Sequence, residues 1–190
     1  RERLERAALD LFHRDGYERT TVRDIATAAG LSPRTFFRHF GSKENVVFAA
    51  AEPELQRLVQ HIRSQPLSDS RGDAACRAVA QFSADMEGNR ERILQQVSLI
   101  LETPSLRRRG LEYQARWADE VAQGLASREG RSEASMEDRA LAAATIGALN
   151  AATVGWTRSG GRTALPDGVN RAFASLRRDL TEVRAPASGR

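Results

Sequence analysis

The first fifty residues contain three glycines, and each one follows a short stretch in which apolar side chains recur at helical spacing. These glycines are Gly16, Gly30 and Gly41. Glycine is favoured just past the end of a helix because it adopts the left-handed backbone conformation without steric cost. The intervals between the glycines leave room for only two or three helical turns each, at ~3.6 residues per turn. This spacing predicts three short helices joined by tight turns.

Residues that commonly begin helices occur where each of these helices is expected to start. Thr21 can cap a helix and has Asp24 three residues further on. Ser32 is followed by Pro33, which is tolerated at the first helical position. Ser42 can cap a fourth helix. The expected apolar core of this segment is supplied by Leu11, Phe12, Ile25, Leu31, Phe36 and Phe40.

The remainder of the chain also has helical spacing, and no alternating pattern of a strand is present. Loops are expected over 64–73 and 130–135. Pro53 breaks or starts a helix, and further helices are expected at about 74–87, 90–102, 105–128, 136–158 and 166–183. We therefore predict an all-α protein of about nine helices, with a head domain at 1–50 and a helical body at 51–190.

The bulk composition restricts the class of protein only broadly. Charged residues make up 28% of the 190 residues and no run of 18 uninterrupted apolar residues occurs, so neither a membrane span nor a membrane partner is expected. The single cysteine, Cys76, excludes an internal disulfide, and without an export signal we expect a cytoplasmic protein. The net charge of +4 divides equally between residues 1–50 and 51–190, so bulk charge does not indicate nucleic-acid binding.

Function is indicated instead by where particular side chains fall. Three short helices, with the third opening on Ser-Pro-Arg-Thr, fit a helix-turn-helix in which the third helix enters the major groove of DNA. Arg34 can form a bidentate hydrogen bond with guanine, and Thr35 can contact a base edge through its hydroxyl or methyl group. The starts of the neighbouring helices at Thr21 and Ser42 can receive phosphates.

The same segment resembles a known family. The runs Gly16-Tyr17, Thr20-Thr21-Val22-Arg23-Asp24-Ile25-Ala26, Ala29-Gly30-Leu31-Ser32 and Thr35-Phe36-Phe37-Arg38-His39-Phe40-Gly41-Ser42-Lys43-Glu44 closely resemble the N-terminal signature of TetR-family repressors. The resemblance implies that Thr21 and Lys43 contact phosphates, that Ser32 to Thr35 face bases, and that Phe37 and His39 lie against the DNA backbone. Phe37 departs from the usual Tyr and lacks its phenol oxygen. The predicted DNA contacts are Thr21, Arg23, Ser32, Pro33, Arg34, Thr35, Phe37, Arg38, His39 and Lys43.

In that family the body binds a small molecule and dimerises through its last two helices. An apolar stripe in each of the last two predicted helices supports a packing seam, and small residues such as Ala143, Ala144, Gly147 and Ala151 allow close approach. The alternative is that these stripes are intramolecular core. The predicted dimer residues are Ile146, Leu149, Thr153, Trp156, Phe173 and Leu176, and Leu180 continues the second stripe.

A ligand pocket in the body is expected from large and polar residues among apolar neighbours. Its predicted lining is Phe82, Met86, Gln96, Tyr113, Trp117 and Asn150. The same mixture of side chains also lines ordinary cores, which is the alternative for each of them.

Other classes of function find less support in the sequence. His13, His39 and His61 are scattered and Cys76 stands alone, so no catalytic residues, metal site or cofactor are expected, and the protein is predicted not to be an enzyme. We predict a transcriptional regulator, a repressor that binds a palindromic double-stranded DNA operator as a homodimer and is released by a small-molecule effector. A transcriptional activator of the same family and a helical interaction protein without DNA binding remain the alternatives.

Overall fold

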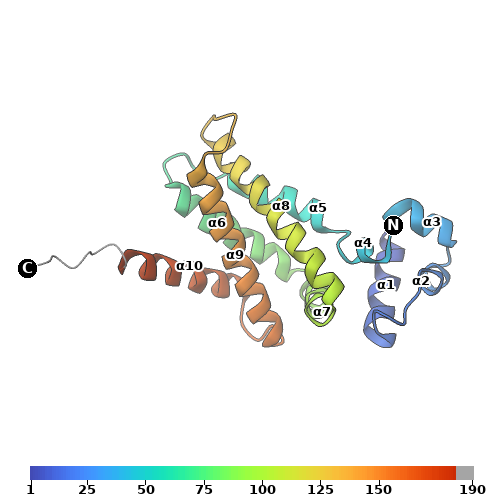
Figure 1. Ribbon diagram of the computed structural model, residues 1–190. Coiled ribbons are helices and arrows are strands. Elements are labelled where there is room, and N and C mark those ends of the chain that lie inside the picture. The colour runs from blue at the N-terminus through green and yellow to red at the C-terminus, as the bar shows by residue number, and fades with distance from the viewer. Residues whose placement is uncertain (183–190) are drawn as a thin grey trace, which may run out of the picture. The chain divides into compact units, whose positions relative to one another are not determined.

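The computed structural model describes the backbone of residues 1–182 and the side chains of residues 1–179, and every regular element in this range is an α-helix. There are ten helices within it (Figure 1), against the predicted number of about nine, and the all-α prediction is confirmed. The helices fall into two compact units. The first contains residues 1–55 and 91–113, and the second contains 56–90 and the described residues from 114 onward.

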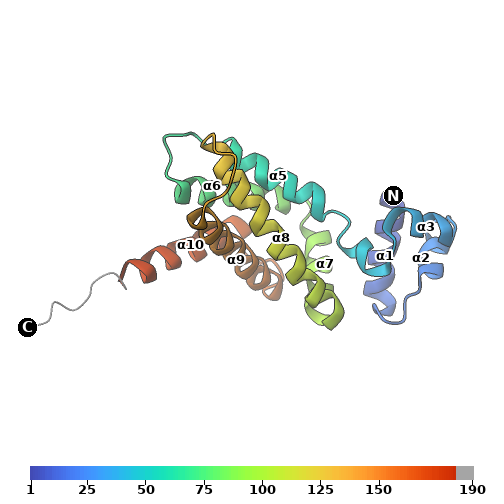
Figure 2. The same cartoon turned by 45° about the horizontal axis from the view of Figure 1, so that its top comes forward.

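The first unit begins with four short helices, α1 to α4, connected by tight turns (Figure 2). It continues through the start of α5, most of α7 and the first part of α8. The bounds are α1 Glu2–Asp15, α2 Val22–Ala28, α3 Pro33–Phe40, α4 Lys43–Val47, α5 Ala51–Arg63, α7 Arg90–Glu102 and α8 Pro104–Arg128.

The predicted caps define these short helices. Thr21 and Asp24 form a capping box, with the Asp24 amide donating to Thr21 Oγ1 at 3.2 Å and the Thr21 amide donating to Asp24 Oδ2 at 2.9 Å. The Thr35 amide donates to Ser32 Oγ at 3.2 Å. Gly16 and Gly41 follow α1 and α3 with φ values of 86° and 71°, which is the left-handed conformation that glycine favours.

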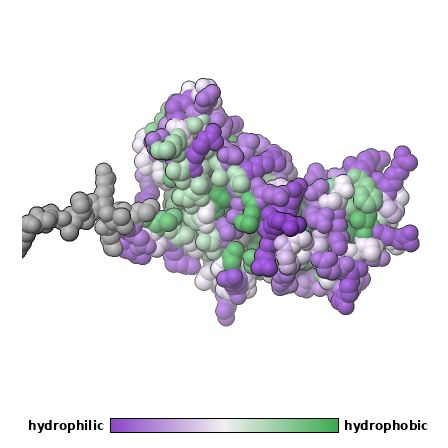
Figure 3. Space-filling model, viewed as in Figure 1, coloured by the Kyte–Doolittle hydropathy of each residue, from purple (hydrophilic) through white to green (hydrophobic). Residues whose placement is uncertain are grey.

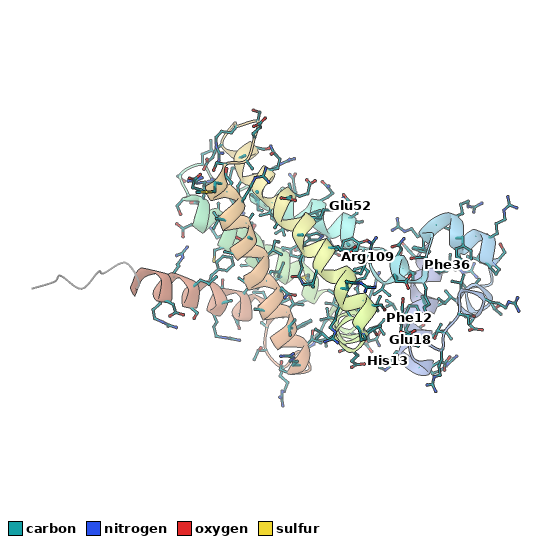
Figure 4. All side chains as sticks on the ribbon, viewed as in Figure 1. Phe12, His13, Glu18, Phe36, Glu52 and Arg109 are labelled. Carbon is teal, nitrogen blue, oxygen red and sulfur yellow. The ribbon has the colours of Figure 1, made fainter. Side chains whose placement is uncertain are left out.

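The core of the first unit includes side chains far beyond residue 50. Phe12 and Phe36, from α1 and α3, are among its largest buried side chains (Figure 4), and Leu106 of α8 is fully buried in the same cluster. The Tyr113 ring stacks on Phe48, and Gln96 Nε2 donates to the carbonyl oxygen of Val47 at 2.6 Å. The helix-turn-helix sequence therefore shares one hydrophobic core with residues of α7 and α8.

The second unit is built on α6 Arg71–Glu87, α9 Met136–Arg158 and α10 Leu165–Glu182, with the remaining parts of α5 and α8. Ser70 Oγ accepts a hydrogen bond from the Asp73 amide, so α6 begins at Arg71, three residues before the predicted start. Pro53 lies in the first turn of α5, where its missing amide hydrogen leaves no helical bond unmade. α10 begins one residue earlier than predicted, and position 183 of the predicted helix lies outside the described residues.

An ionic network closes one end of the second unit, where α6, α8 and α9 meet. Asp138 is fully buried and accepts hydrogen bonds from two guanidinium groups, from Arg131 Nη2 at 2.9 Å and from Arg71 Nη1 at 3.0 Å. Arg128 donates to the carbonyl oxygens of Gln65, Pro66 and Asp69. The hydrogen bonds to Asp138, chiefly the one from Arg131, lower its pKa and keep it charged inside the fold.

Candidate nucleic-acid interface

The helix α3 is held by one face and leaves the other exposed. Phe36 and Phe40 are buried, with ring centroids 5.3 Å apart, and they attach α3 to the core of the first unit. Phe37, one residue further along, is rotated by ~100° around the helix axis and is 52% exposed. Its ring is therefore accessible to a partner that covers this face of the helix.

The exposed face of α3 is cationic. Arg34, Arg38 and His39 are all exposed, Thr35 is half-buried, and α3 contains no carboxylate. Arginine side chains in the first and last turns of such a helix can reach guanine edges and phosphate oxygens. The ring of Phe37 between them can contact sugars or a thymine methyl group. Ser32 and Pro33 are exposed at the start of the helix, Ser32 as its cap.

The start of α2 presents a second polar group. Thr21 and Arg23 are exposed, but Thr21 Oγ1 already lies 2.7 Å from Asp24 Oδ2. This hydrogen bond is the main reason that the pKa of Asp24 is lowered, so the carboxylate is charged at neutral pH. Thr21 can donate to a phosphate only if its hydroxyl hydrogen turns away from Asp24.

Lys43 is half-buried, and its ammonium group binds the turn between α1 and α2. Nζ donates to the carbonyl oxygen of Tyr17 at 2.8 Å and to that of Thr20 at 3.2 Å. It also lies 4.1 Å from the centroid of the Tyr17 ring, which is within cation–π distance. Tyr17 Oη in turn donates to Glu44 Oε1 at 3.0 Å. Sequence reasoning missed Tyr17 and Glu44, because no local pattern signals a contact across 26 residues.

The six predicted pocket residues divide between the two units. Gln96 and Tyr113 belong to the first unit, where Gln96 binds a backbone carbonyl and Tyr113 stacks on Phe48 with centroids 4.6 Å apart. The second unit contains Phe82, Met86, Trp117 and Asn150.

Within the second unit, Phe82, Met86 and Trp117 belong to one hydrophobic core, and Asn150 forms a hydrogen bond with another side chain. Phe82 is buried and meets Trp117 edge-on at 6.0 Å, and Met86 packs against the same core. Asn150 is exposed and its Oδ1 accepts a hydrogen bond from Gln114 Nε2 at 3.1 Å. The structure therefore places Phe82, Met86 and Trp117 in one apolar core, here called the apolar cluster.

Four of the predicted dimer residues lie inside the chain's own core. Ile146, Leu149, Trp156 and Phe173 are buried in the second unit, as the alternative of an intramolecular core requires. Thr153 is half-buried and donates to the Leu149 carbonyl oxygen at 2.8 Å, Leu176 is 36% exposed, and the side chain of Leu180 lies outside the described residues. The opposite face of α9 is exposed. Its small residues, here called the small-residue face, are Ala140, Ala143, Ala144, Gly147, Ala151 and Gly155, and the exposed Asn150 borders them.

Both faces of α9 are thus largely apolar. By length and composition α9 is apolar enough to cross a membrane, with a third of its most apolar window buried. Figure 3 shows apolar side chains gathered over α9. In this fold one side of the helix fills the core and the other carries the small-residue face, which accounts for the high hydropathy. Among the described residues, no group of three or more His, Cys, Asp or Glu side chains could hold a metal ion.

The short capped helices and the cationic α3 define a helix-turn-helix regulator as the class of protein. Residues 5–50 match the family described as bacterial regulatory proteins, tetR family, and residues 70–181 match the TetR C-terminal family described as the MftR C-terminal domain. The second match alone covers more than half of the chain. The chain therefore belongs to the TetR family, whose members are regulators, which confirms the prediction of a protein that is not an enzyme.

Known relatives agree with this assignment. The transcriptional regulator TcmR of Streptomyces glaucescens is 35% identical over 136 residues, 68% of this chain and 60% of that protein. The regulator MftR of Mycobacterium tuberculosis is 33% identical over 129 residues, 65% of this chain and 62% of that protein. The matched stretch thus spans about three fifths of the length of both relatives.

A solved structure shares the fold. The regulator FadR from Bacillus subtilis, in complex with stearoyl-CoA, superposes with a TM-score of 0.62 at 17% identity, covering 92% of this chain and 96% of that chain. At this identity the likeness concerns the fold alone.

Proposed function

We propose that the chain is a transcriptional repressor that binds a palindromic DNA operator as a homodimer and leaves it when a small molecule binds the second unit. The observation that carries this proposal is the exposed face of α3. It combines two arginines, a histidine and a half-exposed phenylalanine ring with no carboxylate, on a helix whose other face is locked by Phe36 and Phe40.

The proposed contacts follow from the placement of each side chain. Arg34 and Thr35, at the start of α3, read base edges in the major groove. Arg23, Arg38 and the neighbouring polar groups bind the sugar-phosphate backbone, which fixes the position of α3 in the groove. The proposed contact set is Thr21, Arg23, Ser32, Pro33, Arg34, Thr35, Phe37, Arg38 and His39.

A palindromic operator requires two heads at a fixed distance, and therefore two copies of the chain. We place the contact between the copies on the small-residue face of α9, because the larger apolar residues of that helix are already buried. A Cβ atom added at Gly147 or Gly155 would meet nothing within 4 Å, so this face is open to a neighbouring helix. Alanine and glycine at four-residue spacing let two helix backbones approach closely.

The effector is proposed to bind in the second unit, near the apolar cluster of Phe82, Met86 and Trp117. Apolar and aromatic side chains with a few polar groups are typical of small-molecule sites, and Gln114 and Asn150 supply polar groups in the same unit. FadR, which has the same fold, forms a complex with stearoyl-CoA, and this supports a small-molecule effector for the present chain.

The direct test begins with operator mapping. Genomic fragments bound by the full chain are recovered and footprinted, and affinity for the recovered site is measured at several salt concentrations. We expect two protected half-sites related by symmetry and an affinity that falls steeply with salt. Absence of selected fragments would favour the alternative of a helical interaction protein, and raised transcription from the bound promoter would favour an activator.

A matched pair of variants assigns the binding to α3. Arg34→Ala combined with Arg38→Ala removes two exposed positive charges from the proposed interface. Arg107→Ala combined with Arg108→Ala removes two exposed positive charges from α8. We expect the first pair to abolish operator binding and the second to leave it nearly unchanged. Equal losses in both pairs would show that binding depends on charge in general and not on α3.

A further inference from the structure

The turn between α9 and α10, residues 159–164, is bound by a guanidinium group from another part of the second unit. Arg90, the first residue of α7, donates through Nη2 to the carbonyl oxygen of Gly161 and, at 3.3 Å, to that of Gly160. A cation is favourable at this place because the end of a helix carries the negative end of its dipole. Arg90 therefore binds the chain directly after the end of α9.

A carboxylate binds the other end of the same turn. Glu87, the last residue of α6, accepts a hydrogen bond at Oε1 from the amide of Leu165, the first residue of α10, at 2.8 Å. An acidic group is favourable there because the start of a helix carries the positive end of its dipole. Glu87 and Arg90, here called the clasp, thus hold the end of α9 and the start of α10 from one short segment of the chain.

Trp156 connects the clasp to the small-residue face of α9. Its side chain is buried, and Nε1 donates to the carbonyl oxygen of Thr163 at 2.9 Å. The centroid of its ring lies 5.9 Å from Arg90 Cζ, which is within cation–π distance. Gly155, the last residue of the small-residue face, directly precedes Trp156. The contacts that fix Trp156 therefore also fix this end of the face.

Two glycines of the turn share a backbone conformation but differ in their surroundings. Gly160 and Gly161 have φ values of 66° and 67°, in the left-handed region that glycine favours. A Cβ atom at Gly161 would lie 2.9–3.1 Å from atoms of the Arg90 guanidinium group, which is closer than van der Waals contact allows. A Cβ atom at Gly160 would meet nothing within 4 Å. The absence of a side chain at Gly161 is therefore what admits Arg90 to the turn.

From this geometry we infer that Arg90 is a positioning residue for the contact between two copies of the chain, because it fixes the end of α9 that carries Gly155. The inference rests on the dimer of the proposed function and adds to it a residue outside the small-residue face. A contact between small residues depends on close approach of two helix backbones. Dispersion attraction falls by about a quarter to a half when a gap of ~0.5–1 Å opens, so such a contact tolerates little displacement of α9.

Two alanine substitutions separate this positioning from general damage to the turn. Gly161→Ala and Gly160→Ala introduce the same left-handed strain, but only the first displaces the guanidinium group of Arg90. Sedimentation of the full chain over a range of concentrations gives the dimer dissociation constant of each variant. We expect this constant to rise about tenfold in Gly161→Ala, where hydrogen bonds of a charged group are lost, and to stay near the wild-type value in Gly160→Ala. Equal constants in the two variants would overturn the inference.

Substitution of Arg90 itself provides the second comparison. Arg90→Ala should raise the dissociation constant by a similar factor, whereas Arg162→Ala, which removes an exposed arginine of the same turn, should leave it unchanged. When Arg90→Ala is the background, Gly161→Ala and Gly160→Ala should dissociate equally, because the group that distinguishes them is absent. A difference that persists in this background would contradict the positioning role. So would a lower free energy of unfolding in Arg90→Ala with an unchanged dissociation constant, since that result describes a clasp that only stabilises the fold.

Amide hydrogen exchange tests the positioning without reference to a dimer. The amide of Ser159 bonds to the last turn of α9, and that of Leu165 bonds to Glu87. Both amides should exchange faster in Arg90→Ala, while that of Asp138, in the first turn of α9, should keep its wild-type rate. Unchanged rates at the first two positions, or equal acceleration at all three, would refute the role of Arg90. If the wild-type chain sediments as a monomer, the proposed function fails at its dimer, while the exchange rates still decide whether Arg90 positions the end of α9.

Discussion

The ring of Tyr113 stacks on the ring of Phe48 with centroids 4.6 Å apart and planes inclined by 14°. This contact joins α8 to the end of the helix-turn-helix sequence, 65 residues earlier in the chain. Leu106, on the same stretch of α8, is completely buried in the core that contains Phe12 and Phe36. The stability of the proposed DNA-binding head therefore depends on residues of α8.

This dependence is measurable by a pair of substitutions on one helix. Leu106→Ala should lower the free energy of unfolding by about 2–5 kcal/mol, because it leaves a cavity in the core of the first unit. Leu111→Ala is the matched control, since Leu111 is 64% exposed, and it should change stability by less than about 0.5 kcal/mol. Urea titration followed by circular dichroism gives both values. Similar values for the two variants would contradict the shared core.

Arg34 is expected to read bases. Arg34→Ala should weaken binding to the mapped operator by about 1–3 kcal/mol and relax the base preference at one position of each half-site. Binding to random DNA should weaken much less, because most of that affinity comes from phosphate contacts elsewhere. Fluorescence anisotropy with operator and random duplexes at one salt concentration measures both losses. Equal losses on the two duplexes would refute the assignment of Arg34 as a base reader.

Phe37 is exposed and its neighbour Phe36 is buried. Substitutions at the two positions should therefore affect different quantities, DNA affinity for Phe37 and folding stability for Phe36. Phe37→Ala should leave the free energy of unfolding within about 0.5 kcal/mol of wild type and still weaken operator binding. Phe36→Ala should unfold the head, at a cost of about 3–5 kcal/mol. Phe37→Tyr restores the phenol oxygen and should bind the operator more tightly than wild type. Wild-type affinity of Phe37→Ala would remove this ring from the proposed interface.

The head was predictable from sequence because its signals are local. Threonine or serine caps, glycine stops and the spacing of Phe36 and Phe40 act within a few residues, so the caps and the bounds of α2 and α3 follow from them. Long-range contacts give no such signal. The burial of Leu106 beside Phe12, and the hold of Lys43 on the turn between α1 and α2, depend on how distant helices meet.

The apolar face of α9 is a second case in which the sequence does not identify the packing partner. Helical spacing placed Ile146, Leu149 and Trp156 on one face, and the structure buries that face. Periodicity cannot tell whether an apolar face packs on its own chain or on a second copy. The small residues on the other face, which include Gly147, were visible as narrow positions, but only the structure shows that they are exposed.

The network around Asp138 should make stability depend on pH. Bonding to Arg131 and Arg71 lowers the pKa of Asp138 in the folded state. Its stabilising effect is therefore complete above the ordinary aspartate pKa of about 4 and is lost progressively as pH falls below that value. Asp138→Asn removes the buried carboxylate that binds both guanidinium groups and leaves them only the partly exposed Glu129, which should cost about 2–4 kcal/mol at pH 7.

Urea titrations at several pH values measure this effect. The difference in unfolding free energy between wild type and Asp138→Asn should be constant from pH 7 to pH 5 and should shrink in more acidic solution. Asp119→Asn is the control, because Asp119 also pairs with an arginine, Arg139 at 3.2 Å, but is 73% exposed. Exposed pairs contribute less than about 1 kcal/mol, so this variant should resemble wild type at every pH. A difference for Asp138→Asn that does not vary with pH would refute the ionic origin.

Gly147 gives the sharpest test of the proposed dimer contact. A Cβ atom at this position would meet nothing within 4 Å of the same chain, so Gly147→Leu fits the folded monomer. Replacing a helical glycine should even stabilise α9 by about 0.5–1 kcal/mol. A bulky side chain there would, however, hold a second α9 away. We expect monomers by sedimentation and much weaker operator binding, since the two half-sites would no longer be bound jointly.

The control for that substitution is Ala115→Leu, which adds a similar side chain to an exposed position of α8 outside the small-residue face. This variant should stay dimeric and should bind the operator with wild-type affinity. A dimer that persists in Gly147→Leu would place the contact between copies elsewhere on the chain. Loss of the dimer in both variants would mean that the contact extends over α8 as well as α9.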